Sequence, residues 1–282
     1  MPEPTVIRHT LQRLTSFVLT CCALLCFLHA APVRAMEQVL SMPVADHASI
    51  AYLLTQKDGS HPDWVLVMFA GGDGSLQLGQ ASDGTLSLRL KDNFLVRART
   101  LLVDDRFATA LVDAPSDQPG GYSDSFRTSP RHAQDVERIA ADLRSRFPTA
   151  RLVLIGTSRG TISSAFVGRA LPDTWDAVIH TSTLSSPSRG QALALVGFNY
   201  GEIHARRQLF VHHVDDGCFL CSFSATKRLA EDGHDLIAVR GGSARGNPCA
   251  AMAHHGFYGQ DQAVVAALKA WISGADWPKE VD

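Results

Sequence analysis

Short apolar segments alternate regularly with longer amphipathic ones along this chain. The short segments predict buried strands at residues 64–70, 107–112, 151–155, 176–180, 208–213 and 235–239. Strands that are apolar on both faces need covering on both sides, and helical patterns lie between them. The sequence therefore predicts an α/β fold, with a mostly parallel central sheet and helices on both of its faces.

The helical patterns have clear ends. Helices are predicted at residues 130–147, 160–171, 224–231 and 261–273. The first of them has Ser129 as its N-cap and Pro130 at its first position, and Pro148 ends it. An antiparallel hairpin is predicted at residues 39–54, before the first parallel strand. Since no internal repeat interrupts the pattern, we expect one domain over residues 36–282.

The first 35 residues differ from the rest. Arg8 and Arg13 precede an apolar run at residues 14–31, and Val33-Arg34-Ala35 follows as a stop rich in small residues. This layout is typical of a secretory signal peptide, so we expect cleavage near Ala35 and a secreted or periplasmic protein. No second long apolar segment follows, and no stable membrane span is expected after cleavage. An uncleaved anchoring helix is the alternative.

The charges nearly balance. The chain has 26 Lys and Arg residues against 28 Asp and Glu, a formal net charge of −2, and no long basic run. Such a chain lacks the positive field that nucleic-acid binding needs, so we expect no nucleic-acid partner. The sequence indicates no oligomeric state.

One strand leads directly into a candidate nucleophile. The segment Gly156-Thr157-Ser158-Arg159-Gly160 follows strand 151–155 and precedes a helix. Gly-x-Ser-x-Gly between a strand and a helix is the pattern of a nucleophile elbow, a tight turn that exposes its serine at the sheet edge. The alternative is an ordinary turn in which Ser158 caps the helix.

A nucleophilic serine needs a basic histidine and a carboxylate that orients this histidine, and both candidates follow later in the chain. Asp215 and Asp216 come after strand 208–213, and His254 and His255 lie ahead of the last helix. A single aspartate or histidine in a loop is more often simply exposed to solvent. Their order after the elbow, and their places at strand ends, favour a catalytic triad.

On these residues the chain resembles the α/β-hydrolase family over nearly all of residues 36–282. The resemblance implies Ser158 as the nucleophile and a carboxylate after strand 208–213. Family members commonly show His-Gly-x-x-Asp at the acid position, and laying this on residues 212–216 selects Asp216. His213 stands where that pattern has glycine, so Asp215 stays open as the alternative.

The resemblance also selects the base and the oxyanion donors. His-Gly-Phe resembles the family sequence around its histidine and selects His255 over His254 as the general base. The oxyanion hole is expected from the backbone N–H of Arg159 and from a second N–H of Gly71 or Gly72, in the glycine-rich loop after strand 64–70. A plain glycine turn is the alternative for that loop.

The part of the chain after the leader keeps Cys218, Cys221 and Cys249. Export predicts an oxidising compartment, in which one disulfide and one free thiol are expected. A Cys218–Cys249 bridge would tie the acid loop to the base loop. Cys221 in place of Cys218, or a Cys218–Cys221 redox pair, are the alternatives.

Histidine, cysteine and aspartate also crowd into the acid and base loops, which raises the question of a metal. His212 and His213 are adjacent on a predicted strand and point to opposite faces, so they cannot both face one ion. The spacing matches no zinc signature. We therefore expect no metal and no cofactor.

Together these features predict an exported serine hydrolase, carboxylesterase-like, that cleaves a small-molecule ester or another acyl substrate, including amides. A serine peptidase of the same fold and a non-catalytic binding protein are the alternatives. The segment before strand 208–213 leaves room for a short cap at most. In it, residues 192–200 are predicted as a small lid, with Phe198 and Tyr200 as pocket walls.

Overall fold

The predicted strands form one twisted sheet. In a computed structural model of the chain, which describes residues 35–45, 47–185 and 193–282, the described residues form a nine-stranded sheet with the order β1-β2-β6-β3-β7-β8-β9-β10-β11. The strands are β1 (Ala35–Pro43), β2 (Ser49–Lys57), β3 (Trp64–Phe69), β6 (Phe107–Val112), β7 (Arg151–Thr157), β8 (Ala177–Thr181), β9 (Arg207–His213), β10 (Asp235–Val239) and β11 (Glu280–Val281). β1 and β2 form an antiparallel hairpin, and β2 also pairs antiparallel with β6. The remaining neighbouring pairs of this sheet are parallel.

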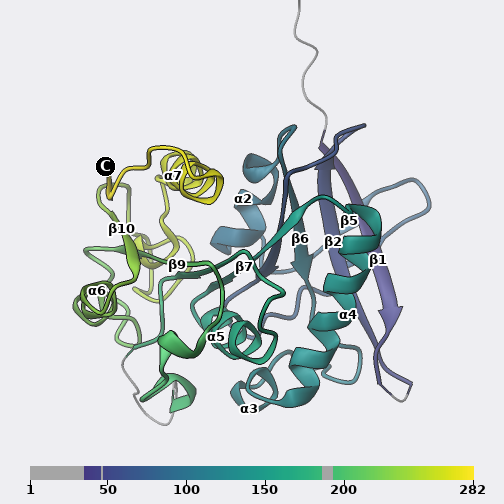
Figure 1. Cartoon of the computed structure of the whole chain (residues 1–282), viewed down its shortest axis with the longest axis horizontal. Coiled ribbons are helices and arrows are strands. Elements are labelled where there is room, and N and C mark those ends of the chain that lie inside the picture. Colours follow the sequence, from purple (N-terminus) through teal and green to yellow (C-terminus); the bar gives the residue numbers. More distant parts are fainter. Residues whose placement is uncertain (1–34, 46, 186–192) are drawn as a thin grey trace, which may run out of the picture. The chain divides into compact units, whose positions relative to one another are not determined.

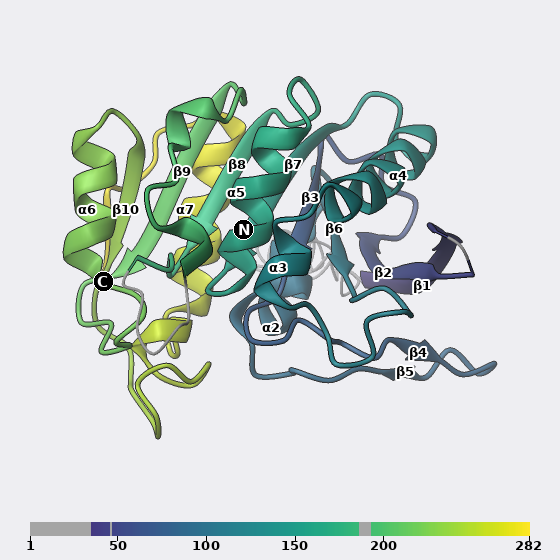
Figure 2. The same cartoon turned by 90° about the horizontal axis from the view of Figure 1, so that it is seen from below.

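Helices cover both faces of this sheet (Figures 1 and 2). They are α2 (Phe94–Leu102), α3 (Asp124–Arg127), α4 (Pro130–Arg146), α5 (Gly160–Ala170), α6 (Phe223–Glu231) and α7 (Asp261–Ser273). Alternate residues of β3 enter two separate cores: Val67 belongs to the same buried cluster as Ile139 of α4, while Leu66 belongs to that of Leu268 of α7. This two-sided burial confirms the predicted α/β architecture.

The predicted boundaries agree closely with the observed ones. Ser129 caps α4, because its side chain accepts the N–H of His132, and Pro130 opens the helix. Apart from three short 3-10 helices, the elements absent from the prediction are α2, the single-turn α3, β11 and the small hairpin of β4 (Gly79–Gln80) and β5 (Leu86–Ser87). Except for α2, these are only two to four residues long.

The sheet reverses its winding direction at β3. The chain passes from β3 to its neighbour β6 on one side and returns to β7 on the other side of β3. In open parallel sheets, the crevice at such a switch point, at the carboxyl ends of the strands, is where ligands bind. The glycine-rich loop follows β3 here, and Ser158 follows β7.

The predicted signal peptide falls almost wholly on residues 1–34, which lie outside the described residues. The described chain forms one compact unit, Ala35–Asp282, and Ala35 is already the first residue of β1. Among the described residues, no helix is both long enough and apolar enough to cross a bilayer.

Candidate active site

Ser158 lies in the turn between β7 and α5, with a left-handed backbone. Its φ is 75°, a conformation that costs a residue with a β-carbon roughly 1–2 kcal/mol. Both glycines of the pentapeptide permit close packing here: a β-carbon on Gly156 would overlap the backbone of Gly160, and one on Gly160 would lie 2.9 Å from the carbonyl oxygen of Ala70. The turn therefore packs against the end of β3, as in a nucleophile elbow.

A chain of hydrogen bonds joins Ser158 to the predicted base and acid loops. The Oγ of Ser158 lies 2.9 Å from Nε2 of His255, and Nδ1 of His255 lies 2.9 Å from Oδ2 of Asp216. A carboxylate only accepts hydrogen bonds, so Nδ1 carries the proton and Nε2 is left to accept from the serine hydroxyl. In this arrangement the histidine can take a proton from the serine.

The carboxylate of Asp216 is buried, and each of its oxygens has a partner. Its side chain is 0% exposed, and Oδ2 lies 3.2 Å from Nε2 of His212 as well as facing His255. Its Oδ1 accepts the N–H of Cys218 at 2.9 Å. Burial raises the pKa of this carboxyl, but the facing imidazoles of His212 and His255 outweigh burial and lower the pKa to about 2. Asp216 is therefore ionised at neutral pH.

The alternatives left open by the sequence face elsewhere. Asp215 is exposed, and its backbone N–H donates to Nδ1 of His213 at 3.0 Å. The ring of His254 stacks on that of His213, with the ring centroids 4.2 Å apart. Of each adjacent pair, the structure thus brings Asp216 and His255 to Ser158.

His213, Asp215 and His254 also place potential metal-binding atoms within 4.8 Å of one another. Both ring nitrogens of His213 are already engaged, because Nδ1 accepts from Asp215 and Nε2 donates to the carbonyl of Gly241 at 2.9 Å. With no free lone pair on His213, this group does not offer the donors of a zinc site.

Two residues that the sequence did not single out hold the loop that carries His255. Ser182 follows β8 with a φ of 48°, and its hydroxyl donates to the carbonyl oxygen of His255 at 2.6 Å. Arg97 of α2 donates to the carbonyl oxygens of Ala251, at 3.2 Å, and of Gly256. These contacts join segments that are distant in sequence, so no local pattern signals them.

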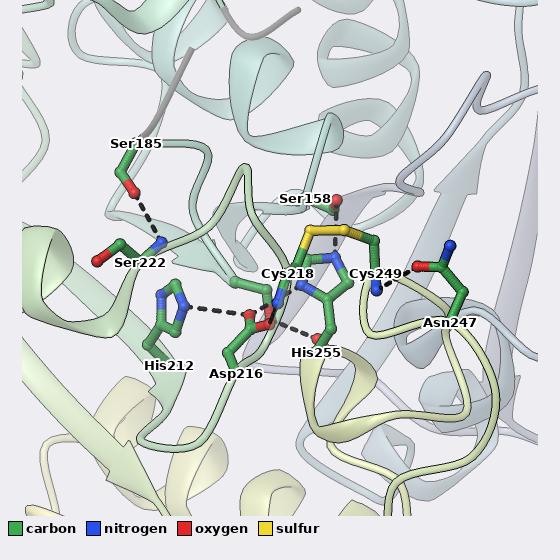
Figure 3. The surroundings of a disulfide bond; sticks show 10 residues. Ser158, Ser185, His212, Asp216, Cys218, Ser222, Asn247, Cys249 and His255 are labelled. Carbon is green, nitrogen blue, oxygen red and sulfur yellow. Dashed lines mark hydrogen bonds and ion pairs between the residues drawn. A yellow bond between two sulfur atoms is a disulfide. The ribbon is translucent and has the colours of Figure 1, made fainter. Parts of the chain in front are cut away.

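A disulfide joins Cys218 to Cys249, and Figure 3 shows it beside the His255 side chain. It links the loop after β9 to the loop that carries His255. Cys221 is a free, buried cysteine, and burial raises the pKa of its thiol.

A cavity of about 360 Å³ opens at Ser158. Its walls are the loop residues Gly71 and Gly72, the segment 90–94 at the start of α2, the elbow and the base loop from Cys249 to Gly256. The segment 90–94 is a wall that the sequence did not indicate. It contains Asn93, whose side chain caps α2 by accepting the N–H of Leu95.

The prediction that Phe198 and Tyr200 form pocket walls is wrong, because neither residue lines this cavity. Phe198 packs against Phe166 of α5, with ring centroids 5.0 Å apart, and Tyr200 packs against Phe210 of β9 at 5.1 Å. Their aromatic surface is used in the core rather than over the site. Of the predicted lid, residues 192–200, only residue 192 lies outside the described residues.

Backbone N–H groups without partners lie beside Ser158. Gly71 is in close contact, since a β-carbon there would lie 2.9 Å from Cβ of Ser158. Within the described part of the chain, no hydrogen bond engages the N–H of Gly71, Gly72 or Arg159. Free donors next to a nucleophile are the chemical requirement of an oxyanion hole.

No protein-family model matches the sequence, and no curated protein matches it. Solved structures do match. XC6422 from Xanthomonas campestris, described as an α/β serine hydrolase without lid, has a TM-score of 0.55 at 15% identity, over 86% of this chain and 96% of that one. Est1E from Butyrivibrio proteoclasticus has a TM-score of 0.57 at 12% identity, over 84% and 98%.

A membrane phospholipase A, described as a bacterial virulence factor, matches over 94% of this chain and 97% of its own, with a TM-score of 0.53 at 14% identity. At such low identities the likeness establishes the fold. The structural matches extend over the whole domain, and the sheet order and the turn after β7 agree with them. The chain therefore has the fold of the α/β-hydrolase family.

Proposed function

We propose that the protein is a serine hydrolase that cleaves an ester through an acyl-enzyme. The observation that carries this proposal is the continuous hydrogen-bonded path from Ser158 through His255 to Asp216. Ser158 attacks the substrate carbonyl and passes its proton to His255, which then donates it to the leaving alcohol. A water molecule, deprotonated by the same histidine, then attacks the acyl-enzyme and releases the acid and free Ser158.

Asp216 holds the imidazole in the tautomer that this chemistry needs. Its low pKa keeps it anionic, so it stabilises the imidazolium that forms when His255 takes up the serine proton. The developing negative charge on the substrate oxygen is met by the N–H of Arg159 and by an N–H of the loop after β3. Export to an oxidising compartment, where Cys218 and Cys249 can pair, is part of the same proposal.

An ester with a small or medium acyl group fits the site better than a long peptide. The cavity of about 360 Å³ lies at the small end of the range for small-molecule pockets. One matching structure is that of a cold-adapted esterase from an Arctic intertidal metagenomic library, which supports ester over amide cleavage for this chain.

The test is hydrolysis of p-nitrophenyl esters of increasing chain length, alongside aminoacyl p-nitroanilides. We expect turnover of the short esters, faster than that of the anilides, and a loss of roughly 10³-fold or more in kcat for Ser158→Ala. Faster anilide cleavage would favour a peptidase. Activity of Ser158→Ala equal to that of the wild type would refute the proposed nucleophile.

A further inference from the structure

Arg127, the last residue of α3, is a buried cation with no anionic partner. Its side chain is fully buried, and among the described ion pairs none includes it. The nearby carboxylate of Asp124 pairs instead with Arg159, at 2.6 Å. Burying a guanidinium without an anionic partner is costly for folding. Its contacts are instead the ring of Tyr122, whose centroid lies 4.5 Å from Cζ, and two neutral oxygen acceptors.

The guanidinium contacts the loop that follows β3, residues 70–74, here named the oxyanion loop. Nη2 of Arg127 donates to the carbonyl oxygen of Ala70 at 3.3 Å, and Nη1 donates to Oγ of Ser163 in α5 at 2.7 Å. The oxyanion loop passes so close that a β-carbon on Gly74 would lie 2.5 Å from Nη2. Burial lowers the pKa of Arg127 to about 10, so it stays charged at neutral pH.

The contact with Ala70 acts on the N–H of Gly71, because both belong to one peptide unit. In a trans peptide the carbonyl and the N–H point in opposite directions. The carbonyl points to the buried Arg127, so the N–H of Gly71 points away from it. A cationic donor on the carbonyl also polarises the unit and makes its N–H a stronger donor.

Gly72 is a weaker candidate for the same role. The carbonyl of its peptide unit, that of Gly71, accepts only the neutral N–H of Gly74, at 3.2 Å. Gly72 is also exposed, whereas Gly71 is buried against Ser158. A donor shielded from water stabilises an oxyanion more effectively than an exposed one.

We propose that Gly71 supplies the second oxyanion N–H and that Arg127 is the positioning residue that orients and polarises its peptide. This inference rests on the proposed function and assigns to α3 a role in it. Arg127 touches no substrate. It acts through the Ala70–Gly71 peptide on the transition state, in which the substrate oxygen becomes negative.

The test compares the hydrolysis of a short p-nitrophenyl ester by Arg127→Met, Arg127→Gln and Arg127→Lys. Each rate is divided by the concentration of enzyme whose serine reacts with a fluorophosphonate. Since the N–H remains but is weakened, we expect kcat to fall about 10- to 100-fold in Arg127→Met, with KM within about 3-fold of the wild type. Arg127→Lys, which keeps the charge, should retain the most activity. Affinity for a trifluoromethyl ketone, which adds to the serine as an oxyanion, should fall in parallel with kcat.

Arg138→Met serves as the control, because Arg138 is an exposed residue of α4, and its kcat should match the wild type. If Arg127→Met does not fold, Arg127→Gln and Arg127→Lys decide the matter. Folded variants with wild-type kcat, or with KM raised and kcat unchanged, would overturn the role of Arg127. Failure of the wild type to react with the fluorophosphonate would instead overturn the proposed function.

Discussion

At the scale of single residues, Ser158 combines a reactive position with an unfavourable backbone. Its φ of 75° is one that glycine adopts freely and alanine does not. We therefore predict that Ser158→Gly is more stable than Ser158→Ala by about 1 kcal/mol, although neither has a nucleophile. Urea denaturation of the two variants measures the difference, and an alanine variant of equal or greater stability would contradict the strain.

Asp216 should make folding sensitive to acid. Its pKa is lowered from 3.8 to about 2 in the folded protein, so its contribution to stability is complete above pH 3.8 and is lost as the pH falls through 2. By linkage this contribution is about 2 kcal/mol. We predict that the free energy of unfolding falls less steeply over this pH range in Asp216→Asn than in the wild type.

The matched control for that experiment is Asp215→Asn, which removes the exposed neighbouring carboxylate. Unfolding is followed by denaturant titration at each pH, and the control should keep the slope of the wild type. Equal slopes for the wild type and Asp216→Asn would mean that the hydrogen bonds of Asp216 do not hold its ionised form.

Local sequence patterns predict the residues whose position depends on the neighbouring strand or helix. Ser158, Asp216 and His255 each follow a strand or precede a helix with a recognisable pattern. Ser182 and Arg127 could not be found this way. Their roles depend on the carbonyl groups of His255 and Ala70, which the fold alone brings to them.

At the scale of elements, the Cys218–Cys249 disulfide ties the loop after β9 to the base loop. It closes a sequence separation of 31 residues, for which the chain-entropy model gives roughly 3–4 kcal/mol. We predict that Cys249→Ala loses about this much stability and also loses kcat, because the His255 loop is no longer tied to the loop that holds Asp216.

Cys221→Ala is the matched control, since Cys221 forms no disulfide. Its stability should still fall when a reducing agent is added, whereas that of Cys249→Ala should not change. Thermal unfolding with and without reductant measures both effects. A wild type whose melting temperature is unaffected by complete reduction would contradict a stabilising role for the bridge.

The local sequence predicts some helices more clearly than others. In α4, a serine cap, a proline at the first position and a buried stripe on one face all agree. In α2, Asn93 caps the helix, but buried residues run consecutively from Phe94 to Val96 and resemble a strand. α2 packs against α7 and β6, and these contacts between distant segments are not visible in the local sequence.

At the scale of the whole molecule, we propose that residues 1–35 direct export and are then removed. Cleavage near Ala35 would leave nearly all of β1, which runs from Ala35 to Pro43 and pairs with β2. We predict that the exported protein starts at Met36, as measured by intact mass and N-terminal peptide analysis. An exported protein that retains residues 1–35 would contradict cleavage and favour an anchored form.

The proposed chemistry requires Ser158 to be an activated nucleophile in the α/β-hydrolase fold. The most direct test is to treat the folded protein with a fluorophosphonate and to identify the modified residue by peptide mass spectrometry. We predict one modified residue, Ser158, with labelling abolished in Ser158→Ala and strongly slowed in His255→Ala. Absence of labelling in the folded wild type, or labelling at another serine, would contradict it.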